Sequence, residues 1–326
     1  MNQLAVSSIK QSGFRPIDKQ AVSLSIGFMS RLGQIESHVV LSDGISASST
    51  NFKCTNERSP LKAVAVSLPT YLDWANPINE VEAANMNNRP DRTRAVIEHF
   101  GFIMGILSKG VKVHLIGPHS DLPESVYTRD IAFVVGNKLI RCNMGADVRK
   151  NETRQILGAI TPPSEVILEG GNVILEGDKL FLGIGDRTNV AAAKWLQEIV
   201  GGDFEVIQIP LNPGVLHLDC AFGPIALPNG HSGGALVYPS AFTTRESLDL
   251  LKQVYGKLYP VSEHDYHHLG TNGFWINPDT VFANPDCPKI VKLLKSLGKE
   301  VLTLPMDEVV KGEGYARCST LPLLRE

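Results

Sequence analysis

The 326-residue sequence lacks the features that mark nucleic-acid-binding and membrane-spanning proteins. Aromatic residues make up only 7% of it, the formal net charge is −3, and the basic residues do not cluster. A nucleic-acid partner is therefore not expected. The sequence also has no apolar run long enough to cross a bilayer and no recognisable signal peptide. We therefore expect a cytoplasmic protein without a membrane partner.

Cysteine is scarce and irregularly placed. The five cysteines are Cys54, Cys142, Cys220, Cys287 and Cys318, and no CxxC pair occurs. An odd number without paired spacing predicts neither a disulfide scaffold nor a zinc ribbon, and it fits a reducing compartment. The sequence suggests no partner for Cys54, Cys142 or Cys287, and we expect no metal and no cofactor.

The first 60 residues differ from the rest of the chain. They are rich in serine, and the stretch 42–51 is polar and turn-like. We predict an N-terminal extension over residues 1–60 and a compact catalytic domain over residues 61–326. An added strand and an oligomer contact are both open roles for the extension, and a homo-oligomer remains open for the whole chain.

From residue 61 onwards, short apolar runs alternate with segments of helical periodicity. A strand over 62–68, a helix over 91–109 and a strand over 111–116 come first. Further helices are predicted at 152–157, 189–200, 245–258 and 288–297. An order of two strands, a helix and a strand recurs about five times, roughly 40–60 residues apart, which suits a few large repeats around an axis. Composition alone indicates only the α/β class.

The C-terminal stretch holds a candidate nucleophile. Cys318 follows Gly312, Gly314 and Arg317 and precedes an apolar run. Glycine lets the backbone approach a ligand closely, and a nearby cation favours the thiolate. Taken alone, this stretch is better explained by a buried cysteine without chemistry. Three stretches upstream favour the nucleophile.

Two of these stretches place a carboxylate next to a predicted strand. Asp130 precedes the strand 131–135, and Glu169 opens the Glu-Gly-Gly-Asn stretch 169–172. A charge in such a place costs free energy unless it is paired. Each carboxylate is therefore either a ligand for a cation or a structural residue. The structural alternatives are a pairing of Asp130 with Arg129 and a solvated hairpin position for Glu169.

The third stretch contains a histidine and a carboxylate two residues apart. Because side chains alternate along a strand, His217 and Asp219 are predicted to share one face and Cys220 to point into the core. A His–Asp pair serves acid–base chemistry, metal binding or structure alone. With Cys318, the stretches supply a thiol, an imidazole and three carboxylates. Three carboxylates suit a cationic substrate, because a guanidinium offers several N–H donors in one plane.

These motifs resemble those of the guanidino-group-modifying enzymes, which include arginine deiminases, dimethylarginine dimethylaminohydrolases and amidinotransferases. The matching motifs are TRD (128–130), EGGN (169–172), HLD (217–219) and RCSTLPLLRE (317–326). Their order matches from about residue 61 to the end. The resemblance implies a five-bladed α/β propeller of ββαβ repeats with pseudo-five-fold symmetry around a central pocket.

The resemblance also implies the chemistry. Cys318 would attack the guanidino carbon, and His217 would protonate the leaving amine and then activate the water that hydrolyses the thiouronium intermediate. Glu169 would hold the substrate and His217, while Asp130 and Asp219 would bind the guanidinium nitrogens. A bound cation also favours the thiolate, so the substrate would help to activate its own nucleophile.

Further matches concern the other end of the substrate. Arg187 and Arg149 lie in segments that resemble those binding a substrate carboxylate, although each is also explained as a surface charge at a helix start. Glu124 stands where relatives more often have Asn or Asp, which alters the contacts with the polar atoms of the substrate. Asn172 replaces the commoner Asp of EGGD. The helical insertion of arginine deiminases is absent from the sequence.

The leading hypothesis is a hydrolase that converts arginine, or a methylated or related arginine, into citrulline and ammonia or a methylamine. An amidinotransferase would form the same intermediate and pass the amidino group to an acceptor amine. The HLD motif favours a deiminase or an amidinotransferase, whereas the stretch 123–127 resembles the dimethylarginine enzymes.

Two alternatives belong to other classes. One is a metal enzyme or binding protein built on His264, His267 and His268, and the other is an inactive binding module on the same fold. Glycine content also suggests a lid formed by His231, Gly233 and Gly234.

Overall fold

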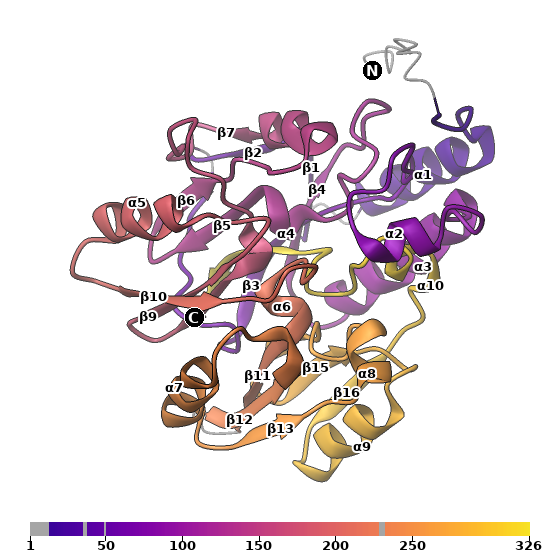
Figure 1. Cartoon of the computed structure of the whole chain (residues 1–326). Coiled ribbons are helices and arrows are strands. Elements are labelled where there is room, and N and C mark those ends of the chain that lie inside the picture. Colours follow the sequence, from indigo (N-terminus) through magenta and orange to yellow (C-terminus); the bar gives the residue numbers. More distant parts are fainter. Residues whose placement is uncertain (1–12, 35–37, 49, 228–231) are drawn as a thin grey trace.

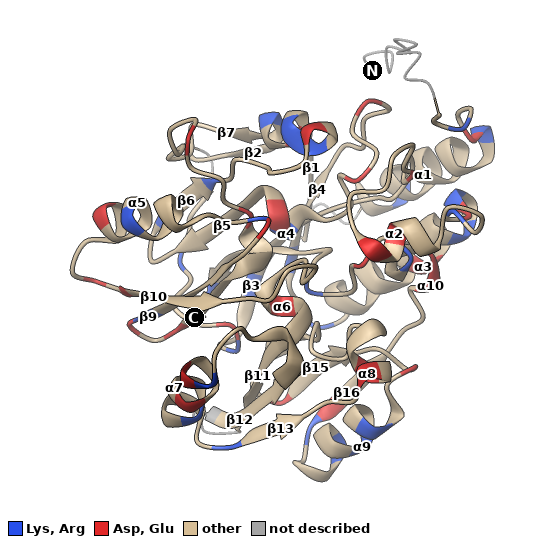
Figure 2. Ribbon diagram, viewed as in Figure 1, with Lys and Arg blue, Asp and Glu red and all other residues tan. Residues whose placement is uncertain are grey.

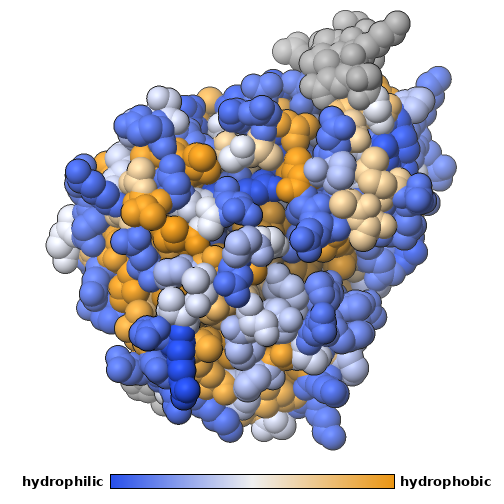
Figure 3. Space-filling model, in the orientation of Figure 1, coloured by the Kyte–Doolittle hydropathy of each residue, from blue (hydrophilic) through white to orange (hydrophobic). Residues whose placement is uncertain are grey.

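The computed structural model describes residues 13–34, 38–48, 50–227 and 232–326. The chain has a mixed α/β fold in which small sheets are surrounded by helices (Figure 1). Hydrophilic residues cover most of the face shown in Figure 3, with apolar residues between them. In the part of the chain described here, no helix is long and apolar enough to cross a membrane.

Three sheets repeat one order of elements, in which an antiparallel hairpin is followed by a helix and by a strand parallel to the second hairpin strand. The first is β8 (Val173–Glu176), β9 (Lys179–Ile184), α5 (Val190–Val200) and β10 (Glu205–Pro210). The second is β11 (Phe222–Ala226), β12 (Ser232–Val237), α7 (Arg245–Tyr255) and β13 (Leu258–Pro260). The third is β14 (Phe274–Asn277), β15 (Thr280–Ala283), α9 (Pro288–Ser296) and β16 (Glu300–Thr303).

The C-terminal strand joins the sheet that contains the first strand of the predicted domain. β17 (Leu321–Arg325) is antiparallel to β3 (Leu61–Ser67), which runs parallel to β4 (Lys112–Ile116) with α3 (Arg92–Leu107) between them in the chain. Because β17 begins three residues after Cys318, this pairing holds the end of the chain that carries the candidate nucleophile.

The remaining hairpin is shorter. β5 (Ala132–Val135) pairs with β6 (Lys138–Arg141), and the helix predicted at 152–157 is a 3-10 helix, η1 (Asp147–Gln155). Ile160 then forms a parallel bridge with Ile140. These pairings establish the individual sheets, and their arrangement as a five-bladed propeller with pseudo-five-fold symmetry stays a prediction.

The predicted N-terminal extension contributes to the same sheets. β1 (Val39–Ser42) runs parallel to β4, and β2 (Ile45–Ser46) pairs with β7 (Ile156–Leu157). α1 (Lys19–Leu32) packs against α3 (Figure 1). The extension thus supplies an added strand, one of its two proposed roles. A domain division at residue 61 stays a prediction.

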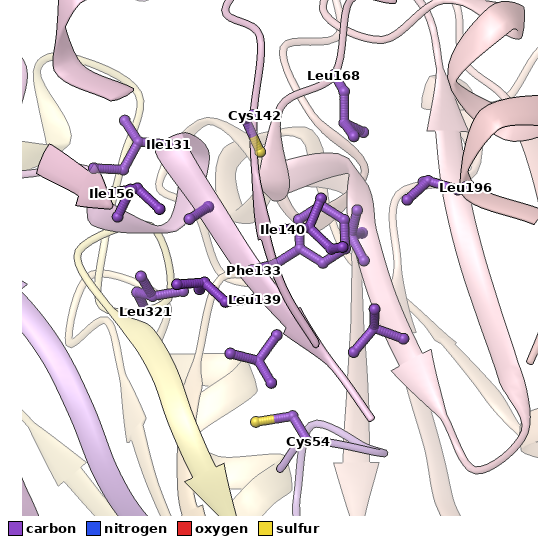
Figure 4. Close-up of a cluster of buried hydrophobic side chains, with 14 of the residues drawn as sticks. Cys54, Ile131, Phe133, Leu139, Ile140, Cys142, Ile156, Leu168, Leu196 and Leu321 are labelled. Carbon is purple, nitrogen blue, oxygen red and sulfur yellow. The ribbon is translucent and has the colours of Figure 1, made fainter. Parts of the chain in front are cut away.

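One apolar cluster lies between β5, β6, β8, β9 and α5 and contains two cysteines. Figure 4 shows Cys142 near Ile131, Ile140 and Leu168, and Cys54 at the lower side of the same cluster. Burial raises the pKa of the Cys142 thiol well above its usual value and that of Cys54 to about 12. Both thiols therefore pack as small apolar groups and are poor nucleophiles.

The two glycines before Cys318 accommodate an aromatic ring. An added Cβ on Gly312 or Gly314 would overlap with the ring or hydroxyl of Tyr127. Tyr127 is buried, and its hydroxyl donates a hydrogen bond of 2.7 Å to the carbonyl of Val309. These glycines thus allow the segment before Cys318 to pack closely against Tyr127.

We predict that Gly314→Ala lowers the free energy of unfolding by about 1–3 kcal/mol, because the added methyl group would overlap with the buried ring of Tyr127. Urea denaturation measures this loss. Gly101→Ala is the matched control: its Cβ would have nothing within 4 Å, and helix propensity predicts an unchanged or slightly higher stability. Equal losses in the two variants would contradict the packing explanation.

Candidate active site

Residues from widely separated stretches meet around Cys318. A small cavity with a volume of about 10 Å³ is lined by Glu124, Asp130, Arg149 and Cys318, together with Glu313. Figure 2 shows acidic positions at α4 (Thr128–Ile131) and α6 (Leu218–Ala221) in the middle of the molecule, whereas many other charges lie on the outer helices. The sequence-predicted residues Glu124, Asp130, Arg149 and Cys318 therefore share one cavity.

Three tight turns bring the predicted residues together. α4 precedes β5, η2 (Gly170–Asn172) precedes β8, and α6 precedes β11, so each turn lies at the start of a hairpin. Both α4 and α6 contact η2. A Cβ on Gly170 would overlap with the carbonyl of Arg129, and a Cβ on Gly171 would overlap with the ring of His217. The Gly-Gly pair therefore permits the close approach of the turns.

A buried ion pair joins His217 and Glu169. His217 Nε2 lies 2.8 Å from Glu169 Oε2, and both side chains are fully buried. Burial raises the pKa of Glu169, but the hydrogen bond and charge of His217 outweigh it and lower the pKa to about 2. Burial lowers the pKa of His217, but Asp130 and Glu169 outweigh it and raise the pKa above its ordinary value. The imidazole is therefore suited to donating a proton.

The second nitrogen of His217 lies beside the turn at Gly171 and near Asp130. His217 Nδ1 lies 3.7 Å from Asp130 Oδ1, too far for a hydrogen bond. Neither atom has a hydrogen-bond partner among the described residues. Nδ1 is thus the ring nitrogen without a partner among the described residues, while Glu169 holds Nε2.

Arg149 is surrounded by carboxylates. Its guanidinium lies 2.7 Å from Asp130, 2.9 Å from Glu152 and 3.6 Å from Glu124. Its donors therefore face protein groups in this structure, and its predicted role in binding a substrate carboxylate stays a prediction. Burial and the nearby carboxylate of Glu82 raise the pKa of Glu124 well above its usual range.

Asp219 is also engaged by an arginine. Its Oδ2 accepts a hydrogen bond from Arg317 Nη1, and Arg317 Nη2 lies 3.1 Å from Glu57, within the predicted extension. Asp219 Oδ2 is also 3.8 Å from the sulfur of Cys318. The Arg317 cation is thus shared by two carboxylates, and a contact between Asp219 and a guanidinium substrate stays a prediction.

Cys220 is buried in an apolar core cluster, as predicted, but the strand geometry on which that prediction rested is wrong. His217 to Ala221 form the cap and body of the short helix α6 rather than a strand, so the alternation of side chains does not apply. The Cys220 thiol lies beside that of Cys318 and 3.6 Å from Asp219 Oδ1. This contact lowers the pKa of Cys318, but burial and the carboxylates of Asp219 and Asp130 outweigh it and raise the pKa.

The sequence analysis missed Asn272, which contacts Cys318 directly. Asn272 Nδ2 lies 3.1 Å from the sulfur of Cys318, and Asn272 Oδ1 accepts a hydrogen bond of 3.1 Å from the Cys318 backbone N–H. A signal was present, because Asn272 is a polar residue just before the predicted strand 273–277. Asp130 was identified by the same kind of position.

An outer cleft adjoins the cavity. It has a volume of about 350 Å³ and includes Glu80, Asp186 and Arg187 in its lining. It shares Ile78 and Leu216 with the inner cavity. Arg187 lies 3.5 Å from Glu169 and also donates a hydrogen bond to the carbonyl of Ile78. Of the two predicted arginines, Arg187 is the one that lines this outer cleft.

The alternative metal site is not supported. Among the residues that the structure describes, one group of three metal-ligand side chains has its ligand atoms within 4.8 Å, namely His217, Asp219 and Cys220. The histidines at 264, 267 and 268 form no such group within those residues. The side chains of His264 and His267 are exposed, at 62% and 54%.

The predicted lid falls partly outside the described residues, which exclude His231. Gly233 and Gly234 belong to β12, a strand paired on both sides within its sheet. These two glycines are therefore part of a sheet and not of a loop over the cavity.

Comparisons with known proteins identify the relatives that this chain resembles in sequence and fold. The profile of the family "N,N dimethylarginine dimethylhydrolase, eukaryotic" matches residues 70–325. The uncharacterised protein YkgA of Bacillus subtilis is 29% identical over 279 residues, which cover 83% of this chain and 95% of YkgA. The N(G),N(G)-dimethylarginine dimethylaminohydrolase of Streptomyces coelicolor is 26% identical over 244 residues, covering 72% of this chain and 87% of that enzyme.

A solved structure has the same fold. The N-terminal domain of ArgZ, an arginine dihydrolase from the ornithine–ammonia cycle in Cyanobacteria, matches with a TM-score of 0.71 and 23% identity. The match covers 81% of this chain and 98% of that chain. At this level of identity the likeness supports the fold alone.

The ion pair predicts a pH-dependent stability. The lowered pKa of Glu169 contributes stability above its ordinary value of 4.5, and this contribution is lost as the pH falls towards about 2. The raised pKa of His217 contributes stability below 6.5, and this contribution is lost as the pH rises through the folded-state pKa. The difference in unfolding free energy between wild type and Glu169→Gln should therefore be largest between about pH 4.5 and 6.5.

Urea denaturation over a pH series measures this difference. The exposed Glu165 gives the matched control, because Glu165→Gln removes a carboxylate that faces solvent and should leave stability nearly unchanged at every pH. A loss in Glu169→Gln that does not vary with pH would show that the pair does not carry opposite charges.

Proposed function

Because the chain belongs to the eukaryotic N,N dimethylarginine dimethylhydrolase family, we propose that it is a cysteine-dependent hydrolase of arginine or a methylated arginine. The family match confirms the resemblance to guanidino-group-modifying enzymes. Dimethylarginine dimethylaminohydrolases and an arginine dihydrolase are among its relatives and structural neighbours. The substrate, the catalytic residues and the products are part of the proposal.

A pair of unsatisfied carboxylate oxygens carries the proposal. Glu124 Oε1 and Asp130 Oδ1 are buried and have no hydrogen-bond partner among the described residues, and both side chains line the cavity with Cys318. A buried carboxylate oxygen without a partner costs free energy. A planar cation with several N–H groups would satisfy both oxygens and would bring its central carbon near the thiol.

The bound cation would also activate the nucleophile. The pKa of Cys318 is raised by burial and by the carboxylates of Asp219 and Asp130, which outweigh the effect of the Cys220 thiol. A guanidinium placed between those carboxylates and the sulfur would favour the thiolate. The thiolate then attacks the guanidino carbon and forms the C–S bond of a tetrahedral adduct.

His217 supplies and removes protons in the two halves of the reaction. It donates a proton through Nδ1 to the leaving nitrogen, the C–N bond breaks, and an S-alkyl-thiouronium remains on Cys318. Neutral His217 then takes a proton from water, whose oxygen attacks the same carbon. Loss of the thiolate gives the ureido group of citrulline. Glu169 orients the imidazole throughout from Nε2.

The other end of the substrate would lie towards the outer cleft. Arg187 is the cation lining that cleft, so we assign it to the substrate carboxylate, with Glu124 facing the polar atoms closer to the thiol. Asp219 and Arg149 complete the charge arrangement around the cavity. We extend the proposal to a cytoplasmic location and to a five-bladed arrangement of the sheets, which the recurring hairpin–helix–strand order supports.

Turnover of guanidines tests the proposal. Purified protein is incubated with arginine, methylated arginines and agmatine, and the products are identified by mass spectrometry. We expect citrulline with ammonia or a methylamine from arginine or a methylated arginine, and a rate reduced about 1,000-fold or more in Cys318→Ala. Cys287→Ala is the matched control, because Cys287 is buried away from the cavity and its variant should keep its activity.

Other products would change the conclusion. Ornithine that appears only with an added acceptor amine would identify an amidinotransferase. No turnover of any guanidine by the folded protein, or turnover that survives Cys318→Ala, would overturn the proposed function.

A further inference from the structure

Asn272 makes two contacts with one residue, Cys318. Its amide nitrogen lies 3.1 Å from the sulfur, and its amide oxygen accepts a hydrogen bond of 3.1 Å from the backbone N–H. Asn272 is fully buried and lies just before β14. The mechanism described above assigns it no task. Both polar ends of a buried amide are thus directed at the candidate nucleophile.

The loop that carries Asn272 is tied to both sides of the sulfur. The backbone N–H of Arg317 donates to the carbonyl of Asn272 at 3.2 Å. On the other side, the hydroxyl of Thr271 donates to the carbonyls of Asp219 and Cys220. Leu269, at the start of this loop, has a positive φ of 54°, which non-glycine residues seldom adopt. The surrounding contacts hold this strained conformation, as is common near functional sites.

We propose that Asn272 is a positioning residue that holds Cys318 in place through the backbone and donates a hydrogen bond to its sulfur when the sulfur is a thiolate. The proposal rests on the proposed function only in taking Cys318 as the nucleophile. The amide is suited to this task because it stays uncharged at every working pH. A neutral thiol accepts a hydrogen bond weakly, whereas a thiolate accepts it strongly.

The charges around the sulfur show why such a donor is needed. Asp219 and Cys220, both on α6, face the sulfur. Asp130 on α4 and Tyr127, the residue before α4, lie on another side. The remaining titratable or charged groups of the cavity are Glu313, Glu124 and Arg149. Most of these groups are acidic, so they oppose a second negative charge. Asn272 and Cys220 are the side chains that contact the sulfur without adding negative charge.

Asn272→Asp tests the proposal in the full-length protein. The carboxylate retains an acceptor for the Cys318 N–H but removes the donor to the sulfur and adds a negative charge. Alkylation of Cys318 by iodoacetamide is followed against pH without substrate, and the modified peptide is quantified by mass spectrometry. We expect the alkylation profile of the variant to move to higher pH, with a rate near neutral pH at least about tenfold lower than that of wild type.

Two further variants isolate the effect. Asn212→Asp is the matched control, because Asn212 is a half-buried asparagine whose amide donates to the carbonyl of Ser240 at 2.8 Å and not to the loop that carries Asn272. Its alkylation profile should coincide with that of wild type. Asn272→Ser removes the sulfur contact without adding charge and should give a smaller shift in the same direction. If Asn272→Asp does not fold, the alkylation profile of Asn272→Ser tests the role of Asn272 instead.

The outcomes separate this proposal from the proposed function. An alkylation profile unchanged in folded Asn272→Asp, or in Asn272→Ser where the aspartate variant does not fold, would overturn the role of Asn272. A shifted profile in a protein that turns over no guanidine would instead retain that role and refute the proposed activity. Where turnover is found, we expect Asn272→Ser to lower kcat more than it raises KM.

Discussion

Buried carboxylates beside one thiol are the constraint on which the site depends. Arg149 offsets the charges of Asp130 and Glu152, and His217 offsets that of Glu169, whereas Glu313 has no ion pair among the described residues. Burial raises the pKa of Glu313 to about 8, with smaller effects from neighbouring charges. Desolvated acids of this kind bind protons or cations, because an isolated buried negative charge is costly. A cationic substrate would relieve this cost and lower the pKa of the thiol.

The fold places these groups by means of tight turns rather than long elements. The short helices α4 and α6 and the 3-10 turn η2 each precede a hairpin, and glycines 170 and 171 let them touch. The pairing of β17 with β3 holds the C-terminal segment, so that Cys318, three residues before β17, lies beside these turns. Arg317 then links Asp219 to Glu57, so the N-terminal extension takes part in the charge arrangement of the site. The ion pairs of Arg317 therefore both stabilise the contact with the N-terminal extension and set the charge next to Cys318.

The sequence predicted those parts of the site that have a local signal. Asp130 and Glu169 stand before apolar strands, and Cys318 stands between glycines and an apolar run, so their positions are visible without a structure. Cys220 was correctly predicted to be buried, but its position beside Asp219 was missed because a strand was assumed where the chain forms a helical turn. The ion pair between Arg317 and Glu57 and the contacts of Asn272 join residues far apart in the sequence. Local periodicity carries no information about such contacts.

The central claim is that the cavity is built for a guanidinium charge. Calorimetric titration of the Cys318→Ser variant with arginine, dimethylarginine and citrulline tests it most directly, because citrulline has nearly the same shape as arginine and no charge on its ureido group. We predict that at least one of the two guanidines binds about tenfold or more tightly than citrulline, since the N–H donors of a guanidinium carry a positive charge and those of a ureido group do not, which strengthens their hydrogen bonds to the free oxygens of Glu124 and Asp130. Equal affinity for citrulline and both guanidines would contradict the account.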